Sequence, residues 1–330
     1  MKITIREIAK RANVSVATVS RAINNKGYVH EETKKIIDKI VEEVGYTPNQ
    51  LARLLLKRQS GIIGVIIPHT GSPFMSELIA GIENEAIANG YKVMLCVTNN
   101  NYEREVDYIK TFEQYMIDGL IISSDFLNTD KIMALNIPII SIDHIIDPNI
   151  PSITTDNIGG GRLAAKKLIE CGANNFVLFR GPSFLITTSE RTLGFTEIIN
   201  KYNYPYEFYD FDLVNPDHHF IYNFLLNNPQ INGFFTLSDV LGVITAGILT
   251  KLGRKLGNDV YLVSFDGLSI AKWVYPTITT VTQPINYMGA IAVSTLIKLL
   301  NGKEIPDQHQ IIQISLKERE STGLNRYISN

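Results

Sequence analysis

The chain has 330 residues, of which 45% are hydrophobic and 19% are charged, and its formal net charge at pH 7 is -2. This length and apolar content suit two or three packed domains and exclude a disordered protein. The N-terminus lacks the apolar stretch of a signal peptide, and no later apolar run is long enough to cross a bilayer, so we expect a cytoplasmic protein without a membrane partner. The two cysteines, Cys96 and Cys171, predict neither a disulfide framework nor a metal site.

The small net charge hides an asymmetry between the N-terminal 60 residues and the rest. Residues 1–60 hold 12 basic and 6 acidic side chains, a net charge of +6, whereas residues 61–330 carry -8. A small basic head on an acidic body indicates that the head binds a polyanion such as the phosphate backbone of DNA.

Residues 5–46 of the basic head are predicted to form three short helices. In the first helix, apolar residues recur at the spacing of one helical face, at Ile5, Ile8, Ala9 and Ala12. Asn13 and Val14 then form a turn, and Ser15 is a favourable N-cap for a second helix that runs from Val16 to about Asn24.

The second helix has two different faces. Val16, Val19 and Ile23 are expected to point to the core. The opposite face is small at its start and carries a fork-shaped cation one turn later, which suits insertion into the major groove. It consists of Ala17, Thr18, Arg21 and Asn24.

A third helix is expected after the loop Lys26–Val29. Glu31 and Glu32 are favourable at its positive N-terminal end. The apolar side that closes the three-helix core is expected to consist of Ile36, Ile37, Ile40, Val41 and Val44.

The segment Thr47–Lys57 begins with a possible N-cap and a proline at the first helical position. A helix of about nine residues is marginal by itself in water, so it needs a partner surface. The three leucines Leu54–Leu56 fit a hinge in which two copies pair across a dimer axis and one leucine wedges between base steps of the minor groove. A short amphipathic helix that caps the following domain is the alternative.

From Gly61 onward, short apolar runs alternate with amphipathic helical stretches such as Ser76–Ala88 and Arg162–Glu170. This alternation predicts an α/β core of doubly wound parallel sheets with helices on both faces, and two units of about 100 to 150 residues fit the length. The runs that we predict as strands are Ile62–Ile67, Lys92–Val97, Leu120–Ser123, Pro138–Ile142, Phe176–Phe179, Gly233–Leu237 and Val260–Phe265.

Ligands of doubly wound sheets bind at the carboxyl ends of the strands. The residues at those ends are an aromatic ring and several polar groups, namely Phe74, Asp143, His144, Asp239 and Asp266. Carboxylates can accept hydrogen bonds from two hydroxyls while a ring covers the C–H side of a sugar, so the pattern favours a carbohydrate ligand.

The run Ile5–Asn24, together with Gly45–Asn49 and Leu51–Arg53, closely resembles the lactose-repressor (LacI/GalR) family of bacterial transcription regulators. The resemblance implies an all-α helix-turn-helix domain whose second helix reads base edges. It implies that Val16, Ala17 and Arg21 face bases and that Ser15, Thr18, Asn24, Tyr28 and Tyr46 lie near phosphates. In the hinge it implies DNA contacts by Asn49, Ala52 and Leu55, with Leu55 as the wedge.

The likeness continues in the body, through Asp156–Asn157, Gly194–Phe195, Pro276–Thr280, Gln283–Pro284 and Arg319–Thr322. It implies a two-lobed core similar to periplasmic sugar-binding proteins. The positions that match effector-binding residues of the family are Phe74, Asp143, Arg191, Ser238, Asp266 and Gln283. In this scheme Asp266 and Gln283 come from the second lobe.

The sequence departs from the family at Met75, Leu213 and Ser238, where an aromatic residue, a stacking ring and an asparagine are frequent. Trp273 is therefore a candidate for stacking on the sugar, and a core anchor behind the cleft is its alternative. His144 is a further candidate ligand-binding residue. For Arg191 and Asp266, an ion pair between the lobes is the alternative.

The resemblance implies a helix-turn-helix domain at residues 1–47, a hinge at 48–60 and an effector-binding core at 61–330. We expect lobe 1 at about 61–156 and 285–314, and lobe 2 at about 157–284 and 315–330. Because no heptad tail follows Thr322, a homodimer is expected rather than a tetramer.

The leading hypothesis is a cytoplasmic, nucleoid-associated repressor of a carbohydrate-utilisation operon. It would bind double-stranded, pseudo-palindromic operator DNA, need no cofactor, and respond to a small sugar or sugar phosphate between the lobes. The segments Asn149–Pro151 and Asp156–Asn157 are similar to those of Gram-positive ribose and sucrose regulators. A catabolite-type regulator that uses a corepressor is the alternative within the family.

Two other classes of protein are disfavoured. An α/β enzyme would need a nucleophile elbow, a P-loop or a dinucleotide fingerprint, and none is present. The run Gly159–Gly161 lacks the required spacing and is expected to follow Asp-Asn rather than a strand end. A transport binding protein would need a signal peptide and would not carry the basic head.

Overall fold

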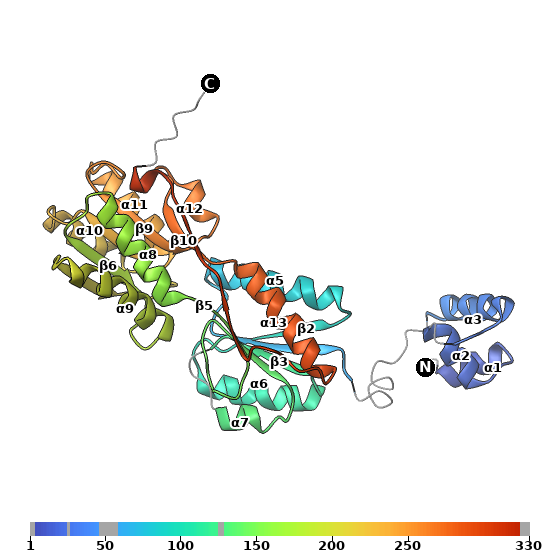
Figure 1. Cartoon of the computed structure of the whole chain (residues 1–330). Coiled ribbons are helices and arrows are strands. Elements are labelled where there is room, and N and C mark those ends of the chain that lie inside the picture. Colours follow the sequence, from blue (N-terminus) through green and yellow to red (C-terminus); the bar gives the residue numbers. More distant parts are fainter. Residues whose placement is uncertain (1–3, 25–26, 46–58, 125–128, 324–330) are drawn as a thin grey trace. The chain divides into compact units, whose positions relative to one another are not determined.

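The computed structural model describes residues 4–24, 27–45, 59–124 and 129–323. The chain forms two compact units, Met1–Ser60 and Gly61–Asn330 (Figure 1). In the part of the chain described here, no helix has the length and apolar character to span a membrane.

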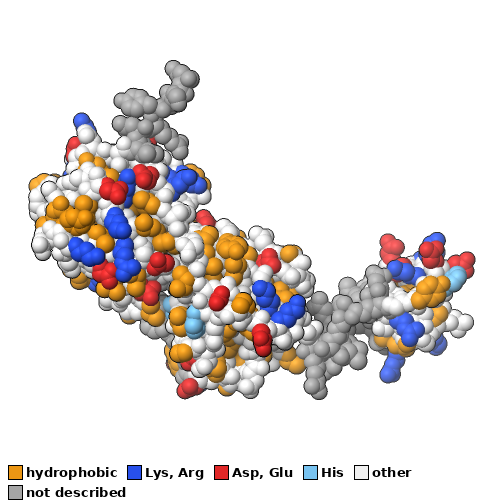
Figure 2. All heavy atoms as spheres, viewed as in Figure 1, with side chains coloured by type: hydrophobic (Ala, Val, Ile, Leu, Met, Phe, Trp, Pro, Cys, Tyr) orange, Lys and Arg blue, Asp and Glu red, His pale blue; other side chains and the backbone are white. Residues whose placement is uncertain are grey.

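The first unit contains the three predicted helices, α1 (Ile5–Arg11), α2 (Val16–Asn24) and α3 (Glu31–Glu43). Its interior is formed by apolar side chains of all three helices, namely Ile8, Ala9, Val19, Ala22 and Ile37. Ile36 differs from the expectation, because 51% of it is exposed, whereas Ile37 is buried and Ile40 and Val41 pack against the core. Figure 2 shows both basic and acidic side chains on the visible face of this unit.

The second unit contains two six-stranded sheets. The first sheet is parallel throughout and has the order β11-β5-β4-β3-β1-β2. Its strands are β1 (Ile62–Ile67), β2 (Lys92–Val97), β3 (Gly119–Ile122), β4 (Ile139–Ile142), β5 (Ser152–Thr155) and β11 (His309–Ile312).

The second sheet has the order β12-β10-β9-β8-β6-β7, with β12 antiparallel to β10 and the other pairs parallel. Its strands are β6 (Phe176–Arg180), β7 (Tyr206–Asp210), β8 (Gly233–Thr236), β9 (Tyr261–Asp266), β10 (Thr279–Thr282) and β12 (Ser315–Lys317). The α/β class and the seven predicted strands are confirmed. The strands that were not predicted are polar or lie at a sheet edge, where apolar runs are short.

Helices cover both faces of each sheet. The helices of the second unit are α5 (Pro73–Ala88), α6 (Tyr102–Tyr115), α7 (Thr129–Met133), α8 (Asn157–Glu170), α9 (Ile186–Lys201), α10 (His218–Asn227), α11 (Asp239–Lys251), α12 (Ile270–Trp273), α13 (Ile285–Leu300) and the 3-10 turn η1 (Glu320–Thr322). Helices α5 and α13 share one apolar core with the first sheet, and α6 and α7 share another with its opposite face (Figure 1).

The chain passes between the two sheets at three neighbouring places within its described residues. The passages follow β5, β10 and β11. We use lobe 1 for the first sheet with α5, α6, α7 and α13, and lobe 2 for the second sheet with α8 to α12. Thr155 at the end of β5 donates a hydrogen bond of 2.7 Å to the side chain of Gln283, which follows β10, so two of the passages are bonded to each other.

Helices α8 and α9 of lobe 2 pack against each other at unusually short range. A Cβ on Gly161 would lie 2.2 Å from the carbonyl oxygen of Arg191, and a Cβ on Gly194 would lie 1.9 Å from that of Ile158. These glycines therefore permit the two backbones to approach. The expectation for Gly159–Gly161 was wrong in one respect, because the run begins four residues after the end of β5 and therefore does follow a strand. Gly161 permits the packing of the two helices, whereas a Cβ on Gly160 would meet the ring of Phe265 and a Cβ on Gly159 would meet the carboxylate of Asp156.

Candidate functional site

The N-terminus of α2 is capped as predicted. The Ser15 hydroxyl accepts a hydrogen bond of 3.1 Å from the backbone N–H of Thr18 and lies 2.9 Å from the Thr18 hydroxyl. Val19 is fully buried and Ile23 is half-buried, but 41% of Val16 is exposed. The prediction that Val16 belongs to the core was wrong, because this first helical residue lies ahead of the contacts that α2 makes with α1 and α3.

The exposed face of α2 carries the groups that the major groove can accommodate. Val16, Ala17 and Arg21 are exposed, and Thr18 is half-buried beside its cap. Tyr28, in the following loop, is 85% exposed. Asn24 ends α2, and its side chain is not described. Other predicted DNA contacts lie outside the described residues, namely Tyr46, Asn49, Ala52 and Leu55.

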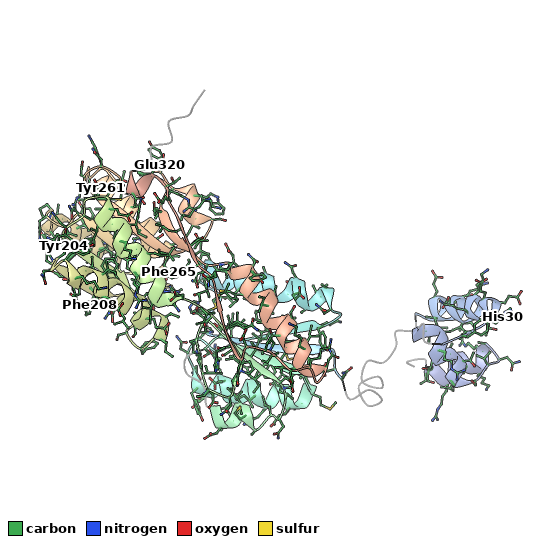
Figure 3. All side chains as sticks on the ribbon, viewed as in Figure 1. His30, Tyr204, Phe208, Tyr261, Phe265 and Glu320 are labelled. Carbon is green, nitrogen blue, oxygen red and sulfur yellow. The ribbon has the colours of Figure 1, made fainter. Side chains whose placement is uncertain are left out.

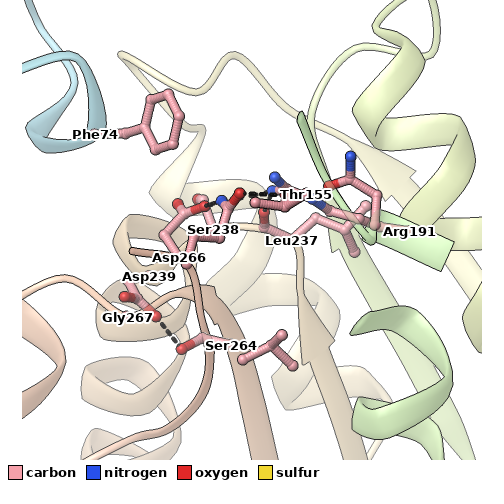
Figure 4. A network of polar contacts seen from close by, with 12 residues as sticks. Phe74, Thr155, Arg191, Leu237, Ser238, Asp239, Ser264, Asp266 and Gly267 are labelled. Atoms are coloured by element: carbon pink, nitrogen blue, oxygen red, sulfur yellow. Dashed lines mark hydrogen bonds and ion pairs between the residues drawn. The ribbon is translucent and has the colours of Figure 1, made fainter. Parts of the chain in front are cut away.

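A cleft of about 610 Å³ lies between the two lobes. Six of the eight predicted ligand-binding residues line it, namely Phe74, Asp143, His144, Arg191, Ser238 and Asp266. Phe74 comes from the first turn of α5 in lobe 1, and Figure 4 shows it across from the polar group of Arg191, Ser238 and Asp266.

Two neighbouring residues of lobe 1 enter the cleft after β4. The backbone of Asp143 has a φ of +77°, and its buried Oδ1 has no hydrogen-bond partner among the described residues. His144 is buried, and its Nε2 lies 3.1 Å from the carbonyl oxygen of Ser124. The carboxylate of Asp143 is therefore the group of this pair that needs a partner from the cleft.

Arg191 of α9 is held from several directions. Its Nε donates to the Asn157 side chain at 2.9 Å, and one terminal nitrogen donates to the carbonyl of Leu237 at 2.8 Å. Its guanidinium lies 3.8 Å from the ring centre of Phe265, which Figure 3 labels in lobe 2. The same terminal nitrogen is 3.5 Å from Oδ1 of Asp266, and both residues belong to lobe 2, so this ion pair does not join the lobes.

Asp266 ends β9 with a φ of +112° and is buried. Burial raises the pKa of its carboxyl to about 8, Arg191 opposes this shift, and the carboxylates of Asp239 and Asp143 add to it. Asp266 also accepts a hydrogen bond of 2.9 Å from the amide of Gln283. The site therefore holds a carboxyl that is readily protonated and that can donate or accept hydrogen bonds.

Gln283 is buried but is not among the residues that line the cleft. It lies behind Asp266 and joins it to Thr155, so it positions the carboxyl rather than facing the ligand. Ser238 lines the cleft and also caps α11, where its hydroxyl accepts from the N–H of Leu241 at 3.3 Å.

Asp239, which follows Ser238, is a structural residue. Its carboxylate accepts a hydrogen bond from the hydroxyl of Ser264 (Figure 4). It also accepts from the hydroxyl of Thr280 and from the N–H of Leu268. Burial raises its pKa to about 6, and these hydrogen bonds oppose the shift. This network fixes the start of α11 against β9 and β10.

Trp273 does not lie in the cleft. It is 78% exposed at the end of the single-turn helix α12, whose buried side is Ala271. The expectation of sugar stacking was therefore wrong, and so was the alternative of a core anchor. A residue two positions after the buried one points away from the core in a helix, and the sequence alone did not place this short helix.

Sequence reasoning missed much of the cleft wall. Residues between predicted elements line it from both lobes, among them His69, Asn99, Phe184, Asp212 and Val214. The position of His69 directly after β1 was a usable signal, because it is also at the carboxyl end of a strand. The loop 211–215 follows β7, which was not predicted, so its residues carried no such signal. His218 and His219 are exposed at the start of α10, outside the cleft.

Family models match both units of the chain. Residues 4–49 match bacterial regulatory proteins of the lacI family, and residues 60–320 match periplasmic binding proteins and the sugar binding domain of the LacI family. The similarity therefore covers the helical unit as well as the two lobes.

Individual proteins give the same result. The chain is 34% identical to a ribose operon repressor of Halalkalibacterium halodurans, with 97% of each chain covered. It is 32% identical to a sucrose operon repressor of Streptococcus mutans, with 96% of this chain and 98% of the relative covered. A crystal structure of a periplasmic binding protein/LacI transcriptional regulator from Alkaliphilus metalliredigens, complexed with D-xylulofuranose, is 27% identical with a TM-score of 0.71 and covers 79% of this chain and 99% of its own.

Proposed function

Because the chain belongs to the lacI family of bacterial regulatory proteins, we propose that it is a DNA-binding repressor of a carbohydrate-utilisation operon, controlled by a small sugar or sugar phosphate in the cleft. One observation carries this proposal: a capped helix with an exposed cation and a cleft with polar groups from two lobes occur in the same chain. The relatives named for ribose and sucrose operons support the sugar class and a regulatory rather than an enzymatic role.

In the DNA complex, α2 lies in the major groove with Val16, Ala17 and Arg21 toward the bases. The guanidinium of Arg21 can donate two hydrogen bonds to one guanine. Phosphates then lie near Ser15, Thr18, Asn24, Tyr28 and Tyr46. Of these, Ser15 and Thr18 are at the N-terminal end of α2, where the positive end of the helix dipole favours an anion. Minor-groove contacts by Asn49, Ala52 and Leu55 remain a prediction.

In the sugar complex, the ring of Phe74 covers the C–H side of the ligand, and the polar groups of Asp143, Arg191 and Asp266 bond its hydroxyls. Ser238 and His144 complete the wall, and Gln283 holds Asp266 from behind. A ligand that bonds both lobes stabilises one angle between them, and through this angle it changes the affinity for DNA. By linkage, the sugar and the DNA alter each other's affinity by the same factor.

The protein acts as a homodimer on a pseudo-palindromic operator in the bacterial cytoplasm and nucleoid. Two copies of α2 then enter the major groove one helical turn apart, which is the geometry that a two-fold operator requires.

The test uses the full chain and a DNA duplex that the chain itself enriches from a random-sequence pool. D-ribose, D-xylulose, sucrose and D-ribose 5-phosphate are added in turn, and the melting temperature and the DNA affinity are measured by thermal shift and fluorescence anisotropy. A ligand at about 100 times its Kd should raise the melting temperature by about 5 °C or more.

The direction of the change in DNA affinity separates the two modes of regulation. Weaker DNA binding in the presence of the sugar supports induction, and stronger binding supports the catabolite-type mode with a corepressor. Failure to enrich any sequence contradicts operator recognition, and silence toward all four sugars contradicts sugar control.

A further inference from the structure

One polar side chain of the cleft has no role in the scheme above. His69 lies in the loop 68–72 between β1 and α5, and it lines the cleft from lobe 1. Its Nδ1 is buried and has no hydrogen-bond partner among the described residues. Because an unpartnered buried polar atom is costly, this nitrogen is suited to a group that arrives with a ligand.

An acidic residue of the other lobe lies at the same side of the cleft. Asp212, in the loop 211–215 that follows β7, lines the cleft and interacts electrostatically with His69. Its Oδ1 accepts hydrogen bonds from the backbone N–H groups of Val214 at 2.7 Å and Asn215 at 3.0 Å. These bonds fix the turn of the loop and thereby the direction of the carboxylate.

The two loops touch each other across the cleft. A Cβ on Gly71 would lie 2.9 Å from Cγ1 of Val214, so a larger residue at position 71 would displace the side chain of Val214. The contact lies beside the cleft, and His69 and Asp212, which both line the cleft, are each two residues away from it in their loops.

We propose that His69 is a specificity-determining residue, and that it and Asp212 together hold one hydroxyl of the sugar at the side where the two loops meet. A hydroxyl is the fitting group because it donates one hydrogen bond and accepts others. The histidine nitrogen and the carboxylate can then bind the same oxygen from opposite lobes. A sugar that lacks a hydroxyl at this position leaves both groups unpaired and binds more weakly.

The protonation state of His69 agrees with this role. Burial lowers the pKa of its imidazole, and Asp212 opposes the shift. A neutral imidazole offers one donor and one acceptor, which suits a neutral hydroxyl.

This inference rests on the proposed function, and the test separates the two. The first step identifies which of D-ribose, D-xylulose and sucrose binds the full chain most tightly. This parent sugar and each of its monodeoxy analogues are then titrated calorimetrically into wild type, His69→Ala and His219→Ala. His219 is an exposed histidine at the start of α10, outside the cleft, and serves as the matched control.

For wild type and His219→Ala, at least one monodeoxy analogue should bind about 5- to 10-fold more weakly than the parent sugar. The affinity of His69→Ala for the parent sugar should be lower than that of wild type by the same factor. The analogue that wild type binds more weakly should bind His69→Ala as tightly as the parent sugar does. An unchanged preference in His69→Ala overturns the inference while the proposed function stands. Failure of every sugar to bind wild type overturns both.

A second pair of variants tests the loop contact without changing a polar group. Gly71→Ala should weaken the parent sugar and reduce the preference for it, because the new methyl group pushes Val214 away. Gly71→Ala combined with Val214→Ala removes the opposing methyl groups and should restore both. Wild-type behaviour of Gly71→Ala, or no recovery in the double variant, overturns the role of the contact.

Discussion

Replacement of Arg191 by methionine keeps an unbranched apolar side chain and removes the hydrogen bonds of the guanidinium. The buried acceptors that lose their donor are Oδ1 of Asn157 and the carbonyl of Leu237, bonded at 2.9 and 2.8 Å. Each unpaired buried acceptor costs about 1–3 kcal/mol, so we expect Arg191→Met to lower the free energy of unfolding by about 3–5 kcal/mol at pH 6. Methionine retains part of the contact with the ring of Phe265.

The loss of stability caused by Arg191→Met should increase at higher pH, because Arg191 also opposes the rise in the pKa of Asp266. A carboxyl with a raised folded-state pKa binds more protons when folded, so its contribution to stability is full below the unfolded pKa and is lost as pH rises through the folded pKa. In wild type this loss of stability with rising pH ends at about pH 8, the pKa of Asp266 in the folded protein. In Arg191→Met the pKa is higher still, so the variant should lose up to about 1.4 kcal/mol more than wild type per pH unit above 8.

The measurement is urea unfolding of the full chain, followed by circular dichroism at pH 6 and pH 9. The control is Arg162→Met, which removes an exposed ion pair with Glu197 on the same two helices. Exposed ion pairs contribute little to stability because water and salt screen them, so the control should change the free energy of unfolding little and show no added dependence on pH. A loss below about 1 kcal/mol for Arg191→Met, or an equal loss at both pH values, would refute the roles given to Arg191 and Asp266.

Two further substitutions test the helix contact in lobe 2 and the DNA-binding face. Gly194→Ala places a Cβ 1.9 Å from the carbonyl oxygen of Ile158 and should lower the melting temperature by about 5 °C or more, whereas Gly247→Ala, with nothing within 4 Å, should leave it within about 2 °C of wild type. Equal melting temperatures would contradict the close packing of the two helices. Arg21→Ala should abolish the preference for the enriched duplex and leave sugar affinity unchanged, with the exposed Lys39→Ala as the control in anisotropy titrations. Retained preference, or loss of both activities, would contradict the role of Arg21 as a base reader.

The sequence by itself determined the elements that depend on local patterns. Helical spacing and the Ser15 cap gave the three helices of the first unit, and apolar runs gave the central strands of both sheets. The rule that ligands lie at strand ends led to Asp143 and Asp266, because Asp143 follows the buried parallel strand β4 and Asp266 ends the largely buried parallel strand β9.

Only the tertiary structure decided which side chains meet across the cleft. Trp273 was misplaced because burial of a residue in a single-turn helix depends on the neighbouring loops rather than on its type. The Arg191–Asp266 pair proved to lie within one lobe, and Gln283 proved to lie behind it. His69 and Asp212 are 143 positions apart in the sequence, and a loop contact at Gly71 joins their surroundings, so no local pattern could have paired them.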